Sequence, residues 1–343
     1  MSAPGCLVTL AQAGQGAQAA RPWVWHKAMA DDMRGDDVAA EAFPADPAGW
    51  RAALIDHGFD AGNAESLGPD HFAVFVDEGT TLIVTFEEAG EVRARLPGRV
   101  PEGLALARPR GWSWLGIIAQ GPTWWRDPAV WRYVDRLVDD AFFEDFDRVL
   151  FLGAGMGGYA AAAYSVAAPG AAVLLAAPQA TLAPGLAAWD GRFRAARRRD
   201  FSTRYAFAPD MTEGAGRVHL IFDPAEREDA MHAALFHRPW CTLLPARRIG
   251  AAPWTALRAM GLTGLLAEAA MEGRLDPATF ARAWRTRRVF GPYLRRMLAL
   301  SETAGHPARA AMVCRSVTAR LKAPFFRRRL AELEASLPAQ EVR

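Results

Sequence analysis

Residues 153–158, Gly-Ala-Gly-Met-Gly-Gly, constrain the fold of this chain more than any other stretch. An apolar run at 148–152 precedes them and an alanine-rich stretch at 159–164 follows, so the pattern predicts a buried strand, a tight turn and a helix. Glycines in such a turn permit backbone angles and close contacts that other residues resist. The turn presents N–H groups at the positive end of the helix, where an anion or a developing oxyanion is stabilised.

The turn matches the nucleophile elbow of α/β-hydrolases, G-x-S-x-G, at every defined position but one. In that motif a serine sits on a strained turn above the sheet and attacks a carbonyl carbon. Here the serine position is Gly155, which carries neither a hydroxyl nor a thiol. We therefore favour a hydrolase-like turn without its nucleophile.

Two nucleotide-binding loops remain as alternatives. The dinucleotide fingerprint G-x-G-x-x-G fits Gly153, Gly155 and Gly158, and it requires an acidic residue about 20 positions further on. The next strand ends within residues 174–179, which contain no acidic residue. The loop of S-adenosylmethionine-dependent methyltransferases usually has an acidic residue two positions before its first glycine, where this chain has Phe151. Each alternative therefore lacks its second requirement.

Strands alternate with helices along the middle of the chain. Short apolar runs predict strands at residues 71–76, 81–86, 111–119, 148–152, 172–175, 217–222 and 241–244. Asp127 and Pro128 predict the N-cap and the first turn of a helix. The alternation predicts an α/β fold, a mainly parallel sheet with helices on both faces, in which the first two strands form an antiparallel hairpin.

The chain resembles a group of bacterial α/β-hydrolase-like proteins whose elbow reads G-x-G-M-G-G-Y and lacks serine. The resemblance implies an α/β-hydrolase-like domain at 66–262, an N-terminal arm at 1–65 that packs on it, and a basic helical C-terminal extension at 263–343. It implies that Asp223, which closes the next-to-last strand, stands at the position of the triad acid. The triad histidine should lie in the loop 245–253, which contains none.

These positions predict a site for a ligand that carries a carbonyl or an oxyanion. Its N–H donors come from the turn at Gly155, Met156 and Gly157 and from the loop near Phe86 and Glu87. A glycine cannot attack a carbonyl, and no histidine is placed to accept a proton. We therefore expect a degenerate, non-hydrolytic protein, a pseudoenzyme rather than a conventional serine hydrolase, that binds a small ligand or a protein partner.

A hydrolase that activates water is the rival hypothesis. In it, Glu87 or Asp223 is the base that activates water for attack on an acyl or sugar-linked substrate. The structural alternatives are a solvated carboxylate at a strand end for Glu87 and the N-cap of the following helix for Asp223. Trp124 and Trp125 lie beside the predicted pocket and are candidates for stacking on a ligand, although packing is the commoner role of such rings.

The charges of the chain are unevenly distributed. Residues 274–343 carry 15 Lys/Arg and 5 Asp/Glu, whereas the other 273 residues carry 25 and 33. We expect the basic helices to pack on the acidic body, with contact to an acidic partner surface as the alternative. The basic residues are spread over several helices without a recognised nucleic-acid-binding module, so the sequence does not favour a nucleic acid as the partner.

Cysteine usage and hydropathy exclude several classes of protein. The three cysteines are far apart and predict neither a disulfide framework nor a zinc site, and no motif calls for a metal or a cofactor. No apolar run approaches 18 residues, and the N-terminus lacks the pattern of a signal peptide. We expect no membrane span and a cytoplasmic location.

Overall fold

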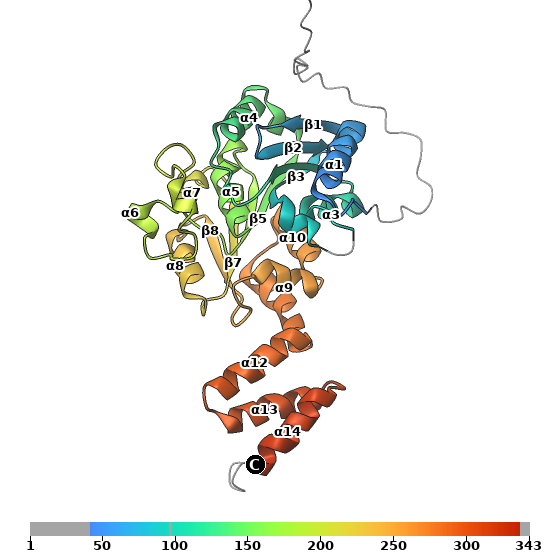
Figure 1. The fold of residues 1–343 in the computed structure, drawn as a ribbon, viewed down its shortest axis with the longest axis vertical. Helices are drawn as coiled ribbons and strands as arrows, with labels where there is room; N and C mark the ends of the chain where they lie inside the picture. The colour runs from blue at the N-terminus through green and yellow to red at the C-terminus, as the bar shows by residue number, and fades with distance from the viewer. Residues whose placement is uncertain (1–41, 96–97, 337–343) are drawn as a thin grey trace, which may run out of the picture. The chain divides into compact units, whose positions relative to one another are not determined.

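The computed structural model describes residues 42–95 and 98–336. These residues form an eight-stranded sheet with the order β1-β2-β4-β3-β5-β6-β7-β8 (Figure 1). β1 (Gly62–Ser66) is antiparallel to β2 (His71–Val76), and β2 is antiparallel to β4 (Ser113–Ala119). All other neighbours are parallel, namely β3 (Thr81–Glu88), β4, β5 (Arg148–Ala154), β6 (Ala172–Ala176), β7 (Arg217–Phe222) and β8 (Cys241–Pro245). The expected mainly parallel sheet of an α/β fold is confirmed.

The predicted hairpin of the first two apolar runs is wrong, because β4 lies between β2 and β3. The turn that connects β2 to β3 passes around the start of β4, so it does not join two paired strands. The N–H groups of Glu78 and Gly79 both donate to the hydroxyl of Ser113, at 2.9 and 3.0 Å. The antiparallel partner of β2 on its other side is β1, a short edge strand with few apolar residues that the sequence pattern did not reveal.

Helices cover both faces of the sheet (Figure 1). One face carries α1 (Pro47–Ala61), α2 (Ala89–Arg93), α3 (Glu102–Ala107), α9 (Pro253–Ala259) and α10 (Thr263–Met271). The other face carries α4 (Pro128–Asp139), α5 (Met156–Tyr164) and α8 (Arg227–Leu235). Asp127 is the N-cap of α4, as expected, and its carboxylate accepts a hydrogen bond from Ala129 N at 2.7 Å.

Helix α5 is buried all around from Gly157 to Tyr164 because the sheet covers one side and the segment after β6 covers the other. The hydroxyl of Tyr159 donates to the carbonyl of Tyr205 in that segment at 2.6 Å. The small side chains of α5 therefore fit two close neighbours rather than a solvent-facing surface. The segment contains α6 (Pro184–Ala187), the 3₁₀ turn η4 (Ala196–Arg198) and α7 (Ala208–Met211). Further 3₁₀ turns are η1 (Arg108–Arg110), η2 (Phe142–Asp145) and η3 (Ser165–Ala167).

Of the N-terminal arm expected at 1–65, residues 1–41 lie outside the described residues. The extension expected at 263–343 is helical: it begins with α10, which packs against the sheet, and continues with α11 (Pro277–Ala283), η5 (Trp284–Arg288), α12 (Gly291–Thr303), α13 (Pro307–Thr318) and α14 (Pro324–Ser336). Helices α12 to α14 have a hydrophobic core of their own, formed by Leu294, Leu298, Ala310, Ala311, Cys314, Val317, Phe326 and Leu333. This core is separate from the one that packs against the sheet.

Candidate ligand site at the elbow

The glycine turn between β5 and α5 has the geometry of a tight elbow. A Cβ atom on Gly153 would lie 2.2 Å from the carbonyl oxygen of Gly157, and a Cβ on Gly157 would lie 2.3 Å from that of Phe86. Both distances are too short for any side chain. These two glycines are therefore required by the close approach of three backbone segments.

Gly155 is different, because a Cβ atom there would meet nothing within 4 Å. Its backbone has φ 55° and ψ −124°, in the left-handed half of the map, where a side chain causes strain. The position at which an elbow presents its nucleophile is thus preserved in shape and open, but it holds no side chain. Helix α5 begins at the next residue, Met156, and among the described residues no side chain caps it, so its first N–H groups have no side-chain acceptor.

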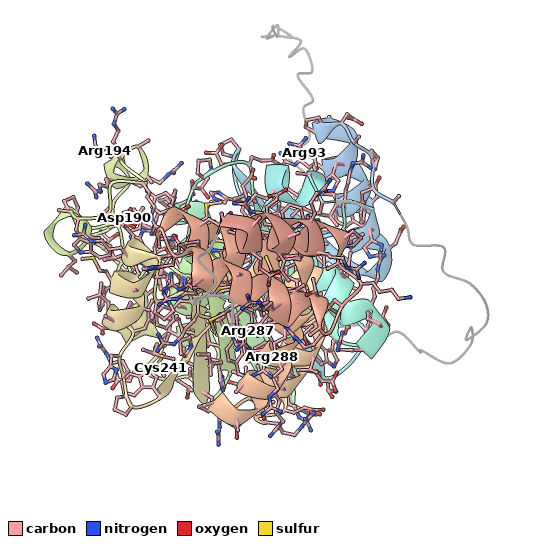
Figure 2. The ribbon with its side chains drawn as sticks, turned by 90° about the horizontal axis from the view of Figure 1, so that it is seen from below. Arg93, Asp190, Arg194, Cys241, Arg287 and Arg288 are labelled. Atoms are coloured by element: carbon pink, nitrogen blue, oxygen red, sulfur yellow. The ribbon has the colours of Figure 1, made fainter. Side chains whose placement is uncertain are left out.

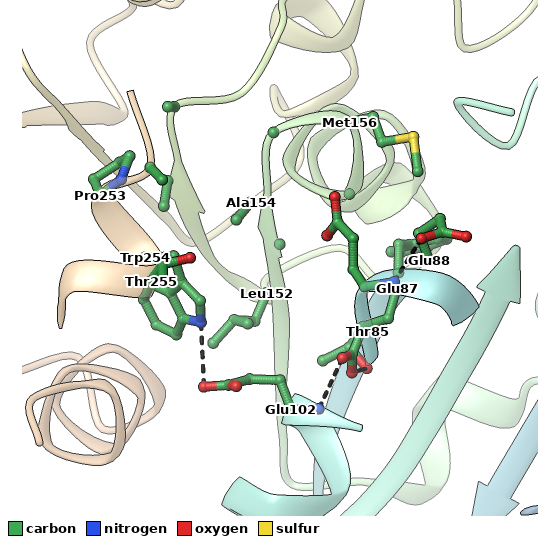
Figure 3. A pocket seen from close by; sticks show the side chains of 18 of the residues that line it. Thr85, Glu87, Glu88, Glu102, Leu152, Ala154, Met156, Pro253, Trp254 and Thr255 are labelled. Carbon is green, nitrogen blue, oxygen red and sulfur yellow. Dashed lines mark hydrogen bonds between the residues drawn. The ribbon is translucent and has the colours of Figure 1, made fainter. Parts of the chain in front are cut away.

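A cavity of about 230 Å³ lies at this elbow (Figure 3). Its floor is formed by the carboxyl ends of β3, β5 and β6, and its walls by α2, the start of α3 and α9. Of the residues predicted for the site, Gly155, Met156, Gly157, Phe86, Glu87 and Trp125 line the cavity. Trp124 and Asp223 are not among its lining residues. The cavity lies at the carboxyl ends of parallel strands, where α/β sheets usually bind ligands.

Glu87 is buried and its carboxylate accepts four hydrogen bonds. The donors are Arg95 at 2.5 Å, the backbone N–H groups of Glu102 at 2.8 Å and Gly103 at 3.0 Å, and the hydroxyl of Thr85 at 3.1 Å. Four bonds occupy the lone pairs that a carboxylate offers. Glu87 thus holds the start of α3 and Arg95 in place at the cavity wall.

Glu102 is the second buried carboxylate of the wall. It accepts a hydrogen bond from Trp254 Nε1 at 3.2 Å (Figure 3). It accepts another from Arg258 Nε at 2.6 Å. Burial raises the pKa of Glu102, and the neighbouring guanidinium of Arg258 opposes this rise. Arg258 binds Glu102 through Nε alone. Its two terminal nitrogens have no partner among the described residues, so they are available to donate to a ligand in the cavity.

Glu91 lies at the rim of the cavity and accepts no side-chain hydrogen bond within the described part of the chain. Partial burial, and then the negative charge of Glu88, raise the pKa of Glu91. The carboxylate of Glu88 is itself occupied, since it accepts from Gly90 N at 2.9 Å and from Glu91 N at 2.6 Å. Of the cavity carboxylates, Glu91 is the one that accepts no hydrogen bond among the described residues, so both of its oxygens can accept from a ligand or a water molecule.

Asp223 directly follows β7, and its buried carboxylate is bound to backbone N–H groups. It accepts from Ala225 N at 3.0 Å, from Arg248 N at 2.9 Å and from Gly250 N at 2.8 Å. Arg248 and Gly250 belong to the loop after β8, where the resemblance placed a triad histidine. The carboxylate thus holds that loop directly. A catalytic role for Asp223 remains a prediction.

The two tryptophans after β4 have different surroundings. Trp125 lines the cavity, donates from Nε1 to the carbonyl of Ile117 at 2.9 Å, and packs edge-on against Phe86 with ring centroids 5.5 Å apart. Trp124 packs against Phe193 with ring centroids 5.1 Å apart. Stacking of a ligand on either ring remains a prediction, and Trp125 is the one in place for it.

None of the described histidines lines the cavity. His71 and His219 are buried beside Thr123 and the carbonyl of Leu275, respectively. His232 is buried on α8, where Nε2 lies 3.0 Å from Asp190 and Nδ1 accepts from Ala180 N at 3.1 Å. Burial lowers the pKa of all three histidines. The elbow therefore has neither of the two side chains that serine hydrolases use to attack a carbonyl.

Within 42–95 and 98–336, no three His, Cys, Asp or Glu side chains gather closely enough to hold a metal ion. No helix in the described part of the chain is long and apolar enough to cross a membrane.

No protein-family model and no curated protein matches the chain. Solved structures that are similar to it include carboxyl esterase 2 from the mycorrhizal fungus Tuber melanosporum, with 14% identity over 63% of this chain and 80% of that one and a TM-score of 0.37. Another is MPT51 of Mycobacterium tuberculosis, with 14% identity over 60% and 95% and a TM-score of 0.40. A third is the thermostable carboxylesterase EstE1 from a metagenomic library, with 12% identity over 70% and 97% and a TM-score of 0.37. Likeness at this level carries no conclusion about activity.

Proposed function

We propose that this chain is a non-hydrolytic protein of the α/β-hydrolase-like fold that binds a small ligand in the elbow cavity. The observation that carries the proposal is Gly155, which keeps the backbone conformation of an elbow and the open space above it without a side chain. The absence of a histidine from the cavity lining supports it, since an attacking hydroxyl would need a base there.

The cavity indicates the chemistry of the ligand. A carbonyl or oxyanion would bind at the N–H groups that begin α5, and Arg258 would add charged donors from the opposite wall. Hydroxyl or amino groups of the ligand would donate to Glu91. At about 230 Å³ the cavity is smaller than the roughly 300–1,000 Å³ of sites for drug-sized molecules, so the ligand is small and polar.

A thermal-shift screen of the wild type, Gly155→Ser and Gly155→Trp tests this proposal. The probes would be short acyl esters, acyl-CoA, sugars, hydroxy acids, phosphate, dinucleotides and S-adenosylmethionine. Gly155→Ser shares the backbone strain of Gly155→Trp but leaves the cavity open, so it is the matched control. A ligand at 100 times its dissociation constant stabilises by about 2.7 kcal/mol. We expect a shift in the wild type and in Gly155→Ser that Gly155→Trp abolishes. Equal shifts in all three proteins would contradict the proposal.

A hydrolase that activates water is the second candidate, and Glu91 favours it more than Glu87 or Asp223 do. Glu91 accepts no hydrogen bond among the described residues and has a raised pKa, as a general base requires, whereas Glu87 accepts four hydrogen bonds and Asp223 three. Ester turnover by the wild type that Glu91→Gln abolishes at unchanged stability would establish this candidate. A cytoplasmic location and a bacterial origin remain proposals as well.

A further inference from the structure

The C-terminal helices carry a strongly one-sided charge. Between Pro277 and Ala331 the sequence has 13 Lys/Arg residues and a single acidic residue, Glu302. Three of these 13 basic residues pair with a carboxylate in the described part of the chain, namely Arg296, Arg315 and Arg329. The other ten cations lack a carboxylate partner there, so packing of the basic helices on the acidic body does not neutralise them.

The fold gathers several of these unpaired cations at one end of the extension. Arg320, just after α13, donates to the carbonyl of Arg288 at the end of η5, at 3.2 Å. The guanidinium of Arg295 in α12 lies 5.6 Å from the ring centroid of Phe325 at the start of α14. These two contacts bring four elements together. We define the basic cluster as the exposed cations that make these contacts, Arg288, Arg295 and Arg320, together with two exposed cations close to Arg320 and Phe325 in sequence, Lys322 and Arg328.

We propose that the basic cluster binds the phosphate backbone of a nucleic acid, with a preference for single strands. Guanidinium groups that lack carboxylate partners are suited to bidentate contact with phosphates, and a polynucleotide offers one negative charge per nucleotide along its length. The guanidinium of Arg295 lies over the ring of Phe325, which is 43% exposed, so part of the ring is accessible for stacking by an unpaired base. Arginines interleaved with an exposed aromatic ring are the pattern of single-strand binding surfaces.

An anionic membrane fits this surface less well. The apolar sides of α12, α13 and α14 are buried in the core of the extension, whereas a helix that lies in a membrane interface needs a broad exposed apolar face. The exposed large apolar residues Val289, Met312 and Phe325 lie on separate elements.

An acidic protein surface fits less well for a related reason. Stable protein interfaces rely on a central group of well-packed aromatic or aliphatic anchors, and the basic cluster offers one exposed ring.

The sequence did not favour a nucleic acid as the partner because it contains no recognised nucleic-acid-binding module. The junction is formed by residues up to 40 positions apart, and this arrangement is visible only in the fold.

Fluorescence anisotropy of the full chain with a labelled 20-nucleotide single-stranded RNA of mixed sequence tests the proposal. If five phosphates are contacted, affinity should fall about 100-fold between 50 and 200 mM salt. The triple variant Arg288→Glu, Arg295→Glu, Arg328→Glu should lose more than about tenfold in affinity at 50 mM salt. Phe325→Ala should weaken binding of the single strand more than binding of a duplex.

The control is Arg148→Glu, Arg194→Glu, Arg217→Glu, which changes the net charge equally at exposed, unpaired arginines of the body. Arg194 lies well apart from Arg287 and Arg288 of the extension (Figure 2). The control should keep affinity within about threefold of the wild type. Circular dichroism would verify folding, with glutamine in place of glutamate if charge reversal unfolds the extension. Equal losses in both triple variants would overturn the proposal, as would wild-type binding to phosphatidylserine vesicles or to an acidic polypeptide but not to RNA.

Discussion

Gly153 and Gly155 are glycines of one turn that are required for different reasons. Gly153→Ala would push a methyl group to 2.2 Å from the carbonyl oxygen of Gly157, so the elbow must move. Gly155→Ala has room for its methyl group and costs only backbone strain, about 1–3 kcal/mol. We expect the free energy of unfolding, measured in urea, to fall further in Gly153→Ala. Equal losses in the two variants would show that the elbow adapts more freely than its contacts indicate.

Asp223 gives a second prediction about a single residue. Asp223→Asn replaces one acceptor oxygen with an N–H₂ group that faces either the N–H of Gly250 or the N–H groups of Ala225 and Arg248. We expect a loss of about 1–3 kcal/mol in stability because buried donors lose their partner. Ligand binding at the elbow should persist, since Asp223 is not among the lining residues of the cavity. A variant of unchanged stability that no longer binds would instead favour a role in the site.

How well individual residues could be predicted depended on their distance along the sequence. Gly155, Met156 and Gly157 were identifiable because the motif is contiguous. Glu102 and Arg258 were missed, since they meet only when α3 and α9 pack at the same cavity wall, 156 positions apart. Glu91 was missed because an acidic residue in a short helix gives no sign of which side chains surround it.

An ionic network joins the segment after β6 to helix α8, in which Asp190, Asp229 and His232 are buried and Arg192 is exposed. His232 faces Asp190, and Arg192 contacts both Asp190 and Asp229, at 2.9 and 2.7 Å. Nδ1 of His232 accepts from a backbone N–H, so the ring is neutral and donates from Nε2 to Asp190. The network is one polar attachment of this segment, which covers α5, and Arg126 is another, with three hydrogen bonds to residues 200–204.

The pH dependence of stability follows from the lowered pKa of His232. Below about pH 6.5 the histidine of the unfolded chain takes up a proton that the histidine of the folded chain does not. Protonation stabilises the unfolded state, so the free energy of unfolding falls as the pH falls. The slope is at most about 1.4 kcal/mol per pH unit for one histidine. His232→Gln, which does not titrate but has an amide that could donate to Asp190, should show a smaller loss between pH 6.5 and pH 5 in urea unfolding. Identical pH dependence in both proteins would contradict this account.

At the level of elements, strands and helices were predictable where a local pattern decides them. The cap at Asp127 and the apolar runs of β4 to β8 are such cases. The pairing of β2 with β3 was predicted wrongly because a four-residue polar turn looks the same whether it closes a hairpin or passes around another strand. Only the contact of that turn with Ser113 distinguishes them.

The separate core of α12 to α14 leads to a prediction for the whole molecule. A chain that ends at Phe290 loses this core and keeps the one that packs against the sheet. It also loses the contact of Tyr293 with Trp284, at a centroid distance of 5.7 Å, and the pair of Arg296 with Glu226 at 2.7 Å. We expect the shortened chain to fold cooperatively, with a melting temperature only a few degrees lower, and to retain ligand binding at the elbow. Loss of cooperative unfolding would mean that the extension is required by the body.

The most direct test of the central claim is the steady-state turnover of short aryl esters and thioesters by the full wild-type chain, with Gly155→Trp as the blank. The account predicts no turnover by the wild type above that of Gly155→Trp, because the elbow has no nucleophile and the cavity no histidine. Saturable turnover that disappears when the elbow is filled would contradict it and would identify the cavity as an active site.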